Sequence, residues 1–268
     1  MRTQRVYFLN KHGNKLAANF DWPEHGDPVG FALYAHCFTC SKNLKTMVRV
    51  IESIVDGGFA VFRFDFTGIG ESEGDFSETN LSTNIDDLIA AAEYLAAQNQ
   101  APQLLLGHSL GGATALMAAG SLASVAAVAT IAAPYDPSHL SGLLADAKNM
   151  AANNGVAEVV IGGTRFRLKK QFFDDLQLKK QQMSNAIRNL DKALLIMHSP
   201  KDTIVPIEQA GQIFRDAKHP KSFISLDPAD HLLSDINDAR FAGSLIATWA
   251  KRYLHNPATN GVNGAFPR

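Results

Sequence analysis

Short apolar runs alternate with amphipathic segments along most of this chain. The runs at 31–36, 59–64 and 192–198 are short and continuous, which is typical of strands buried on both faces of a parallel sheet. Segments 43–56 and 83–98 instead repeat apolar residues at helical spacing, so each would cover the sheet with one face. The alternation predicts an α/β fold with a mostly parallel central sheet and helices on both faces.

The same pattern predicts the remaining elements of the core. Further strands are expected at 6–10, 16–22, 103–106, 125–132 and 222–226, and further helices at 112–119 and 241–253. The first two strands are separated by His12, Gly13 and Asn14 and should form a hairpin. Thr83 and Asp86 have the spacing of a capping box, which predicts that the second helix begins near Thr83.

Segment 135–190 interrupts this alternation because it is far longer than an ordinary connection between two strands. It contains helical stretches at 140–152 and 169–183 around a strand-like piece at 158–167. Its place in the chain favours a lid inserted over the end of the sheet. A peripheral insertion without a role at the site is the alternative.

The insertion divides the predicted core into residues 1–134 and 191–255. The last residues, 256–268, are rich in Asn, Gly, Pro and Ala and lack periodicity, which predicts a flexible tail or linker. A chain of 268 residues is long enough for one large domain of this kind.

Composition and charge narrow the class of protein. Hydrophobic residues make up 46% and charged residues 19% of the chain, which favours a globular protein over a disordered one. The net charge of -1 argues against a nucleic-acid-binding surface, because neutralising phosphates takes an excess of positive charge. No apolar stretch has the length of a membrane span, and the N-terminus lacks the apolar core of a signal peptide. We therefore expect a cytoplasmic protein; the sequence indicates no oligomeric state.

The strongest chemical signal is the sequence Gly-His-Ser-Leu-Gly from Gly107 to Gly111. It follows the apolar run 103–106 and precedes the small residues of 112–119, so it predicts a strand, a sharp turn and a helix. Such a turn lifts the serine above the end of a sheet, where its hydroxyl can attack a carbonyl. A Cβ at either glycine would collide with the neighbouring strand or helix. Ser109 is therefore the candidate nucleophile.

A nucleophilic serine requires a base and a carboxylate that orients the base. Asp202 follows the strand 192–198 and His231 follows the strand 222–226, which is the order expected after the serine in this architecture. Asp202 would hold the imidazole in the correct tautomer, and His231 would act as general base and then general acid. The alternatives are a turn role for Asp202, a surface position for His231, and Asp230 as a rival acid.

Two backbone amides would stabilise the oxyanion that forms during the attack. One belongs to Leu110, directly after the nucleophile, and the other to Phe38 in the loop after strand 31–36. Three histidines lie at strand ends beside these groups and are expected to contact the substrate, with packing in the core as the alternative. These are His36, His108 and His198.

Three further patterns have competing interpretations. Cys37 and Cys40 form a Cys-x-x-Cys pair that fits a redox site, half of a metal site, or two buried thiols beside the active site. The loop 68–70 lacks the third glycine of a phosphate-binding pattern and is expected to edge the pocket. A basic patch in the insertion is either a solvated face or a site that attracts anionic substrates. It comprises Arg165, Arg167, Lys169, Lys170, Lys179 and Lys180.

Taken together, these motifs resemble those of the α/β-hydrolase superfamily: the loop 36–39, the segment 65–72, the turn at 107–111, Asp202 and His231. More narrowly, segments 36–42 and 63–74 are similar to the hydrolase half of bifunctional proteins with a C-terminal OsmC-type domain. The resemblance covers about residues 5–255. It departs from the superfamily at Cys37, where a glycine is usual, and it implies an OsmC-type domain in a longer natural chain.

The motifs and the resemblance together predict a serine hydrolase that cleaves small or short-acyl carboxylic esters through an acyl-enzyme on Ser109. This chemistry requires no metal and no organic cofactor, and the expected partner is a small-molecule ester. Serine at the turn argues against relatives that use aspartate there, such as haloalkane dehalogenases and epoxide hydrolases. Three alternatives stay open: cleavage of amide, peptide, thioester or carbon–carbon bonds by the same residues, a thiol-based redox protein using Cys37 and Cys40, and a catalytically silent binding module.

Overall fold

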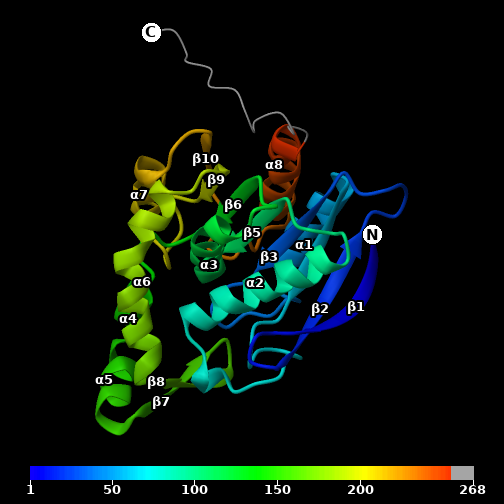
Figure 1. The fold of residues 1–268 in the computed structure, drawn as a ribbon. Helices are drawn as coiled ribbons and strands as arrows, with labels where there is room; N and C mark the ends of the chain where they lie inside the picture. Colours follow the sequence, from blue (N-terminus) through cyan, green and yellow to red (C-terminus); the bar gives the residue numbers. More distant parts are fainter. Residues whose placement is uncertain (255–268) are drawn as a thin grey trace.

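A central eight-stranded sheet organises the computed structural model, which describes residues 1–254 (Figure 1). The strands lie in the order β1-β2-β4-β3-β5-β6-β9-β10. β2 pairs antiparallel with β1 and β4, and the other pairs of this sheet are parallel. The strands are β1 (Arg2–Leu9), β2 (Lys15–Trp22), β3 (Gly30–Ala35), β4 (Phe59–Phe64), β5 (Leu104–His108), β6 (Ala127–Ile131), β9 (Ala193–His198) and β10 (Lys221–Ser225). The predicted mostly parallel sheet and its N-terminal hairpin are confirmed.

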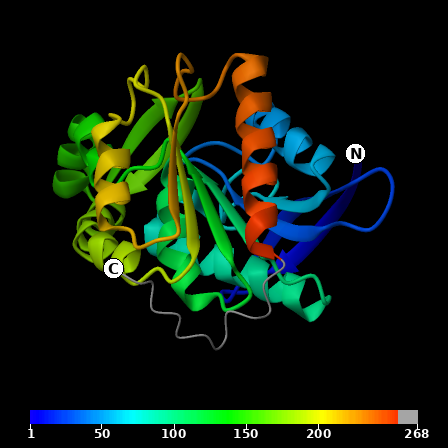
Figure 2. The same cartoon turned by 90° about the horizontal axis from the view of Figure 1, so that it is seen from above.

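Helices cover both faces of this sheet (Figures 1 and 2). The helices of the core are α1 (Lys45–Asp56), α2 (Leu81–Ala97), α3 (Leu110–Ala118), α7 (Glu208–Asp216) and α8 (Ile236–Leu254). α1 and α8 pack on one face, whereas α2, α3 and α7 pack on the other. Successive strand residues enter opposite layers, so Leu104 and Leu106 of β5 lie in the α1–α8 layer and Leu105 lies in the other.

Residues 135–190 add α4 (His139–Leu143), α5 (Ala145–Asn154), a hairpin of β7 (Val156–Ile161) and β8 (Thr164–Lys169), and α6 (Lys170–Arg188). The hairpin is a separate two-stranded sheet. α6 buries Phe172, Phe173 and Leu176 in the core that it shares with α2 and α3. β8 lies beside the short 3₁₀ turn η1 (Phe76–Glu78), as Figure 1 shows. The expected helices and strand-like piece are therefore present, and the lid role of this segment stays a prediction.

Several helix starts and one helix differ from the sequence-based prediction. α2 begins at Leu81, because Asn80 is its N-cap: the Asn80 side chain accepts from the Thr83 amide at 2.9 Å, and the Thr83 hydroxyl accepts from the Asn80 amide at 2.8 Å. The predicted capping box of Thr83 and Asp86 is therefore wrong. α8 begins earlier than expected, at Ile236, and α7 was not predicted at all.

Within residues 1–254, every helix is too short or too polar to cross a lipid bilayer. The predicted tail or linker at 256–268 lies outside the described residues.

Replacing Asn80 by Ala removes the cap of α2 and the contact of Asn80 with Gln171 on α6. We expect Asn80→Ala to lower the free energy of unfolding by about 1 kcal/mol, measured by urea denaturation. Asn80→Asp is the matched control, because aspartate accepts from the same amide, and its loss should be much smaller. Equal losses in both variants would contradict the assignment of Asn80 as the cap.

Candidate active site

Ser109 sits at the apex of a sharp turn between β5 and α3. Its φ of +54° is a strained value for a residue with a side chain. A Cβ on Gly107 would overlap the Gly111 carbonyl, and a Cβ on Gly111 would overlap the carbonyl oxygens of Ala35 and His36 at the end of β3. The two glycines therefore allow β3, β5 and α3 to approach closely, as expected for this turn from the sequence.

The structure brings His231 and Asp202 to this serine. The carboxyl ends of parallel strands meet at one edge of a sheet, and Asp202 and His231 follow β9 and β10 there. His231 Nε2 lies 3.1 Å from Ser109 Oγ, and His231 Nδ1 lies 2.7 Å from Asp202 Oδ2. The serine hydroxyl can donate to one imidazole nitrogen while the other donates to the carboxylate.

Asp202 is held as an anion by its surroundings. Its side chain is 1% exposed, and its Oδ1 accepts from the amides of Ile204 and Val205 at 2.9 Å each. Burial by itself raises the pKa of Asp202, but hydrogen bonds from His198, His231 and the Val205 amide outweigh it and hold the pKa below its usual range. The Asp202 carboxylate is therefore charged in the folded protein at neutral pH. The rival acid, Asp230, instead accepts from the Ser234 amide at 2.8 Å.

The amides predicted for the oxyanion lie at the same edge of the sheet. Leu110 is the first residue of α3, where a backbone N–H has no partner within the helix. Neither the Leu110 amide nor the Phe38 amide has a hydrogen-bond acceptor among residues 1–254. Phe38, Ser109 and Leu110 line the same small cavity, so the residues that carry these two amides adjoin the serine.

The three histidines expected to contact substrate are buried instead. His36, His108 and His198 are each no more than 1% exposed, and each imidazole is hydrogen-bonded to backbone. His108 Nε2 lies 2.8 Å from the His231 carbonyl, and His198 Nε2 lies 2.8 Å from the Val205 carbonyl. The substrate-binding assignment is corrected: His108 and His198 hold the loops that carry His231 and Asp202, and His36 holds the loop after β3.

The protonation of His108 follows from its burial. Burial and the nearby His231 lower the pKa of His108 to about 3, so its ring is neutral and its Nε2–H donates to the His231 carbonyl. A neutral ring here adds no positive charge that would oppose the formation of the His231 imidazolium.

His36 fixes the loop after β3. Its Nδ1–H donates to the Cys37 carbonyl at 2.7 Å, and its Nε2 accepts from the Phe66 amide at 3.2 Å. Burial lowers the pKa of His36, in keeping with this neutral form. Cys37 and Cys40 are joined as a disulfide with their Cα atoms 5.3 Å apart, so the interpretation as two free buried thiols is wrong.

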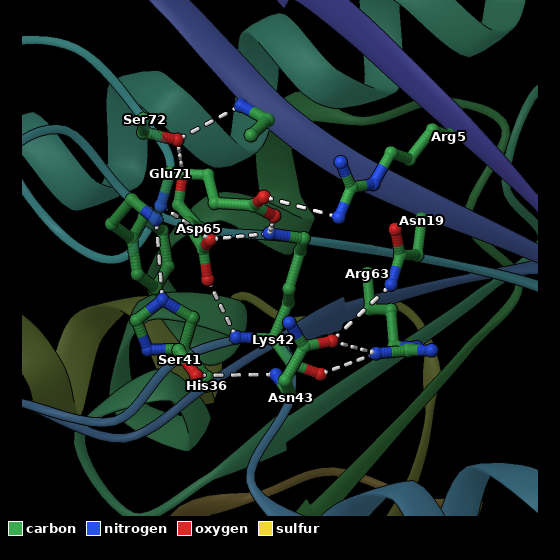
Figure 3. A network of polar contacts seen from close by, with 12 residues as sticks. Arg5, Asn19, His36, Ser41, Lys42, Asn43, Arg63, Asp65, Glu71 and Ser72 are labelled. Carbon is green, nitrogen blue, oxygen red and sulfur yellow. Dashed lines mark hydrogen bonds and ion pairs between the residues drawn. The ribbon is translucent and has the colours of Figure 1, made fainter.

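A buried ion-pair network lies beneath the same loop (Figure 3). Lys42 is 1% exposed, and its Nζ lies 2.6 Å from both Asp65 Oδ2 and Glu71 Oε2. The Lys42 amide donates to Asp65 Oδ1 at 2.7 Å, and Arg63 donates to the Lys42 carbonyl at 2.7 Å. The sequence analysis missed Lys42, since a lysine in a loop ordinarily faces water. The only signal was its place in the segment 36–42 quoted for the family resemblance.

Two cavities open around this region. A small one of about 40 Å³ adjoins Ser109 and is lined mostly by apolar residues. These are Phe38, Leu110, Pro134, Pro137, Leu140, Leu143, Ile204 and Val205, with Ser109 and His139. A larger cleft of about 710 Å³ lies between β8 and the loops 39–41 and 68–77, where the glycine-rich loop was expected to edge a pocket.

Comparisons with known proteins agree with this geometry. Residues 41–153 match the family described as serine aminopeptidase, S33. The crystal structure of an esterase domain from a Rhodothermus marinus protein is 44% identical, with a TM-score of 0.77 over 95% of this chain and 100% of that domain. The chain belongs to the α/β-hydrolase superfamily. The family resemblance stated from the sequence is thereby confirmed, whereas the OsmC-type domain stays a prediction.

Other relatives of this chain are more distant. YfhR of Salmonella typhi is 24% identical over 244 residues, which cover 89% of this chain and 77% of the relative. The rat mitochondrial palmitoyl-protein thioesterase ABHD10 is 33% identical over 82 residues, or 31% of this chain and 27% of the relative. Together these comparisons support a hydrolase with esterase-like neighbours.

The Lys42 network generates a stability prediction. Lys42→Met leaves the buried Asp65 without its ammonium partner, and breaking a buried pair in this way costs about 3–5 kcal/mol. We expect that loss in the free energy of unfolding, measured by urea denaturation. Arg5→Gln is the control, because Arg5 is 68% exposed on the same network and solvent screens its charge. Similar losses in the two variants would contradict a dominant role for the buried pair.

Proposed function

We propose that this α/β-hydrolase is a serine esterase that cleaves short-acyl carboxylic esters through an acyl-enzyme on Ser109. One observation carries the proposal: an unbroken hydrogen-bond chain runs from the Ser109 hydroxyl through His231 to Asp202, with distances of 3.1 and 2.7 Å. The 44% identity to an esterase domain supports the same reaction class.

The proposed reaction has two halves. His231 Nε2 takes the hydroxyl proton as Ser109 Oγ attacks the ester carbonyl, and Asp202 stabilises the imidazolium that forms. The Phe38 and Leu110 amides bind the oxyanion of the tetrahedral intermediate. His231 then protonates the departing alcohol, which leaves the acyl-enzyme. Water activated by the same imidazole releases the acid and restores the serine.

The size of the cavity beside Ser109 supports a short acyl group. Its volume of about 40 Å³ is a few times the space that one water requires, and its wall is apolar. A relative described as a palmitoyl-protein thioesterase raises thioester cleavage as a second candidate, and the matched peptidase family raises amide cleavage. Matched acyl esters, thioesters and amides of one chain length, assayed with the same protein, distinguish the three.

Removing the nucleophile tests the proposed chemistry. We expect Ser109→Ala to reduce kcat for p-nitrophenyl butyrate by about 10⁵-fold or more, with an unchanged unfolding midpoint. The matched control, Ser121→Ala, removes an exposed hydroxyl and should keep full activity. A fluorophosphonate probe should add its mass to the control and not to Ser109→Ala. Retained turnover by a folded Ser109→Ala protein would contradict the assignment.

The wall of the small cavity should set the acyl preference. Leu140 lines this cavity from α4, so Leu140→Ala opens space for a longer chain. We expect the ratio of kcat/KM for octanoate to that for butyrate to rise about tenfold, in line with the energy of a few methylenes in a pocket. Leu178→Ala, on the exposed side of α6, is the control. An unchanged ratio in Leu140→Ala would mean that α4 does not shape the acyl site.

A further inference from the structure

The side chains of the basic patch in the 135–190 insertion fall into two groups: those with a polar partner among residues 1–254 and those without one. Lys169 pairs with Glu78, Lys170 with Asp174 at 2.5 Å, and Lys180 with Asp136 at 2.6 Å. Lys179 donates to Gln182 at 3.3 Å. Arg165 and Arg167 differ from these lysines: among residues 1–254, neither guanidinium group has an ion-pair partner or a side-chain hydrogen bond.

The two arginines face the same space. Arg165 and Arg167 are two positions apart on β8, so their side chains leave the same face of the hairpin. Both line the cleft of about 710 Å³, together with residues of the loops 39–41 and 68–77. Both residues are exposed, so their guanidinium groups are accessible to a ligand in the cleft.

The acidic groups around the cleft do not neutralise this pair. Asp75 is the carboxylate in the lining, and its Oδ1 accepts from the Ser77 amide at 2.8 Å. Hydrogen bonds to Ser77, and then the nearby Lys169 and Arg167, hold the pKa of Asp75 below its usual range. Glu158 stands opposite Arg167 in the hairpin register but does not line the cleft. The cleft lining therefore contains two guanidinium groups and one carboxylate. That carboxylate already accepts a hydrogen bond from the Ser77 amide.

A row of contacting aromatic rings lies between this cleft and the small cavity at the serine. Phe38 lines the small cavity with Ser109, and its ring centroid lies 5.7 Å from that of Phe76. Phe76 in turn lies 4.9 Å from Phe166, and both of these rings line the cleft. The cleft and the cavity at Ser109 are therefore neighbours, separated by the contacting rings of Phe38 and Phe76.

We propose that the cleft is a subsite for a carboxylate on the alcohol half of the ester, and that Arg165 and Arg167 bind that carboxylate. This inference rests on the proposed esterase function. Guanidinium groups suit the role because their planar donors match the two oxygens of a carboxylate. In this proposal, the small apolar acyl group binds on one side of Phe38 and the anionic alcohol group binds on the other.

A matched pair of substrates tests the subsite. The anionic ester is 3-(4-butyryloxyphenyl)propanoate, and the neutral ester is the corresponding propanamide, so the cleaved bond and its leaving phenol are alike. We expect Arg165→Gln/Arg167→Gln to lower the anionic-to-neutral ratio of kcat/KM about tenfold, mainly through KM for the anionic ester. Arg49→Gln/Arg240→Gln removes the same charge from exposed positions on α1 and α8 and should leave the ratio unchanged.

The outcomes separate the two proposals. An equal ratio in the wild-type protein and in Arg165→Gln/Arg167→Gln overturns the subsite while esters are still cleaved. The same fall in the Arg49→Gln/Arg240→Gln control also overturns it, since the effect would then come from net charge. If the wild-type protein cleaves neither ester, the esterase proposal fails. Calorimetric binding of the anionic ester to Ser109→Ala, with and without the two arginine changes, then decides the subsite by itself: an affinity unaffected by the arginines overturns it.

Discussion

The close approach of β3, β5 and α3 is the constraint on which the rest of the site depends. At Gly107 and Gly111 the distance between backbones leaves no room for a Cβ, so strand, turn and helix are in direct backbone contact. That contact brings the first amide of α3 beside the loop that leaves β3. It also forces Ser109 to a φ of +54°, a strain of order 1 kcal/mol or more that the surrounding packing must offset. The position of the Ser109 hydroxyl at the apex of the turn is a consequence of this backbone geometry.

A second layer of interactions holds the β3 loop from the side opposite the turn. The Lys42 amide donates a hydrogen bond to Asp65, and the Lys42 carbonyl accepts one from Arg63. At the start of the loop, the His36 ring accepts a hydrogen bond from the Phe66 amide. Buried ion pairs contribute little net stability, because desolvation offsets most of their attraction. Their geometry is strongly directional, however, because a displaced partner leaves an unpaired charge in the protein interior. We infer that this network serves to define the path of residues 36–42, and with it the position of the Phe38 amide.

The sequence predicted the parts of this structure that rest on periodicity and on short motifs. Apolar runs located the strands, and the glycines around Ser109 located the turn, because each pattern has one physical reading. The buried histidines show the limit. A histidine at a strand end reaches either the pocket or the core, and sequence spacing does not say which; burial places His36, His108 and His198 in the core. The helix α7 was missed because it is short and buries only Ala210 and Ile213, too few positions to show a helical repeat.

The burial of Lys42, and which members of the basic patch lack a partner, could not be predicted for a different reason. Whether a cation is paired depends on acids that are distant in sequence, such as Asp65 for Lys42 and Asp136 for Lys180. Of the six basic residues, Arg165 and Arg167 are the two whose side chains have neither an ion-pair partner nor a hydrogen bond among residues 1–254, and both line one cleft. Phe38 lies beside that cleft, because its ring centroid is 5.7 Å from that of Phe76 in the cleft wall, and Phe38 also lines the small cavity with Ser109. The contact between these two rings brings the cleft next to the candidate nucleophile, and that proximity depends on residues too distant in sequence for spacing to reveal it.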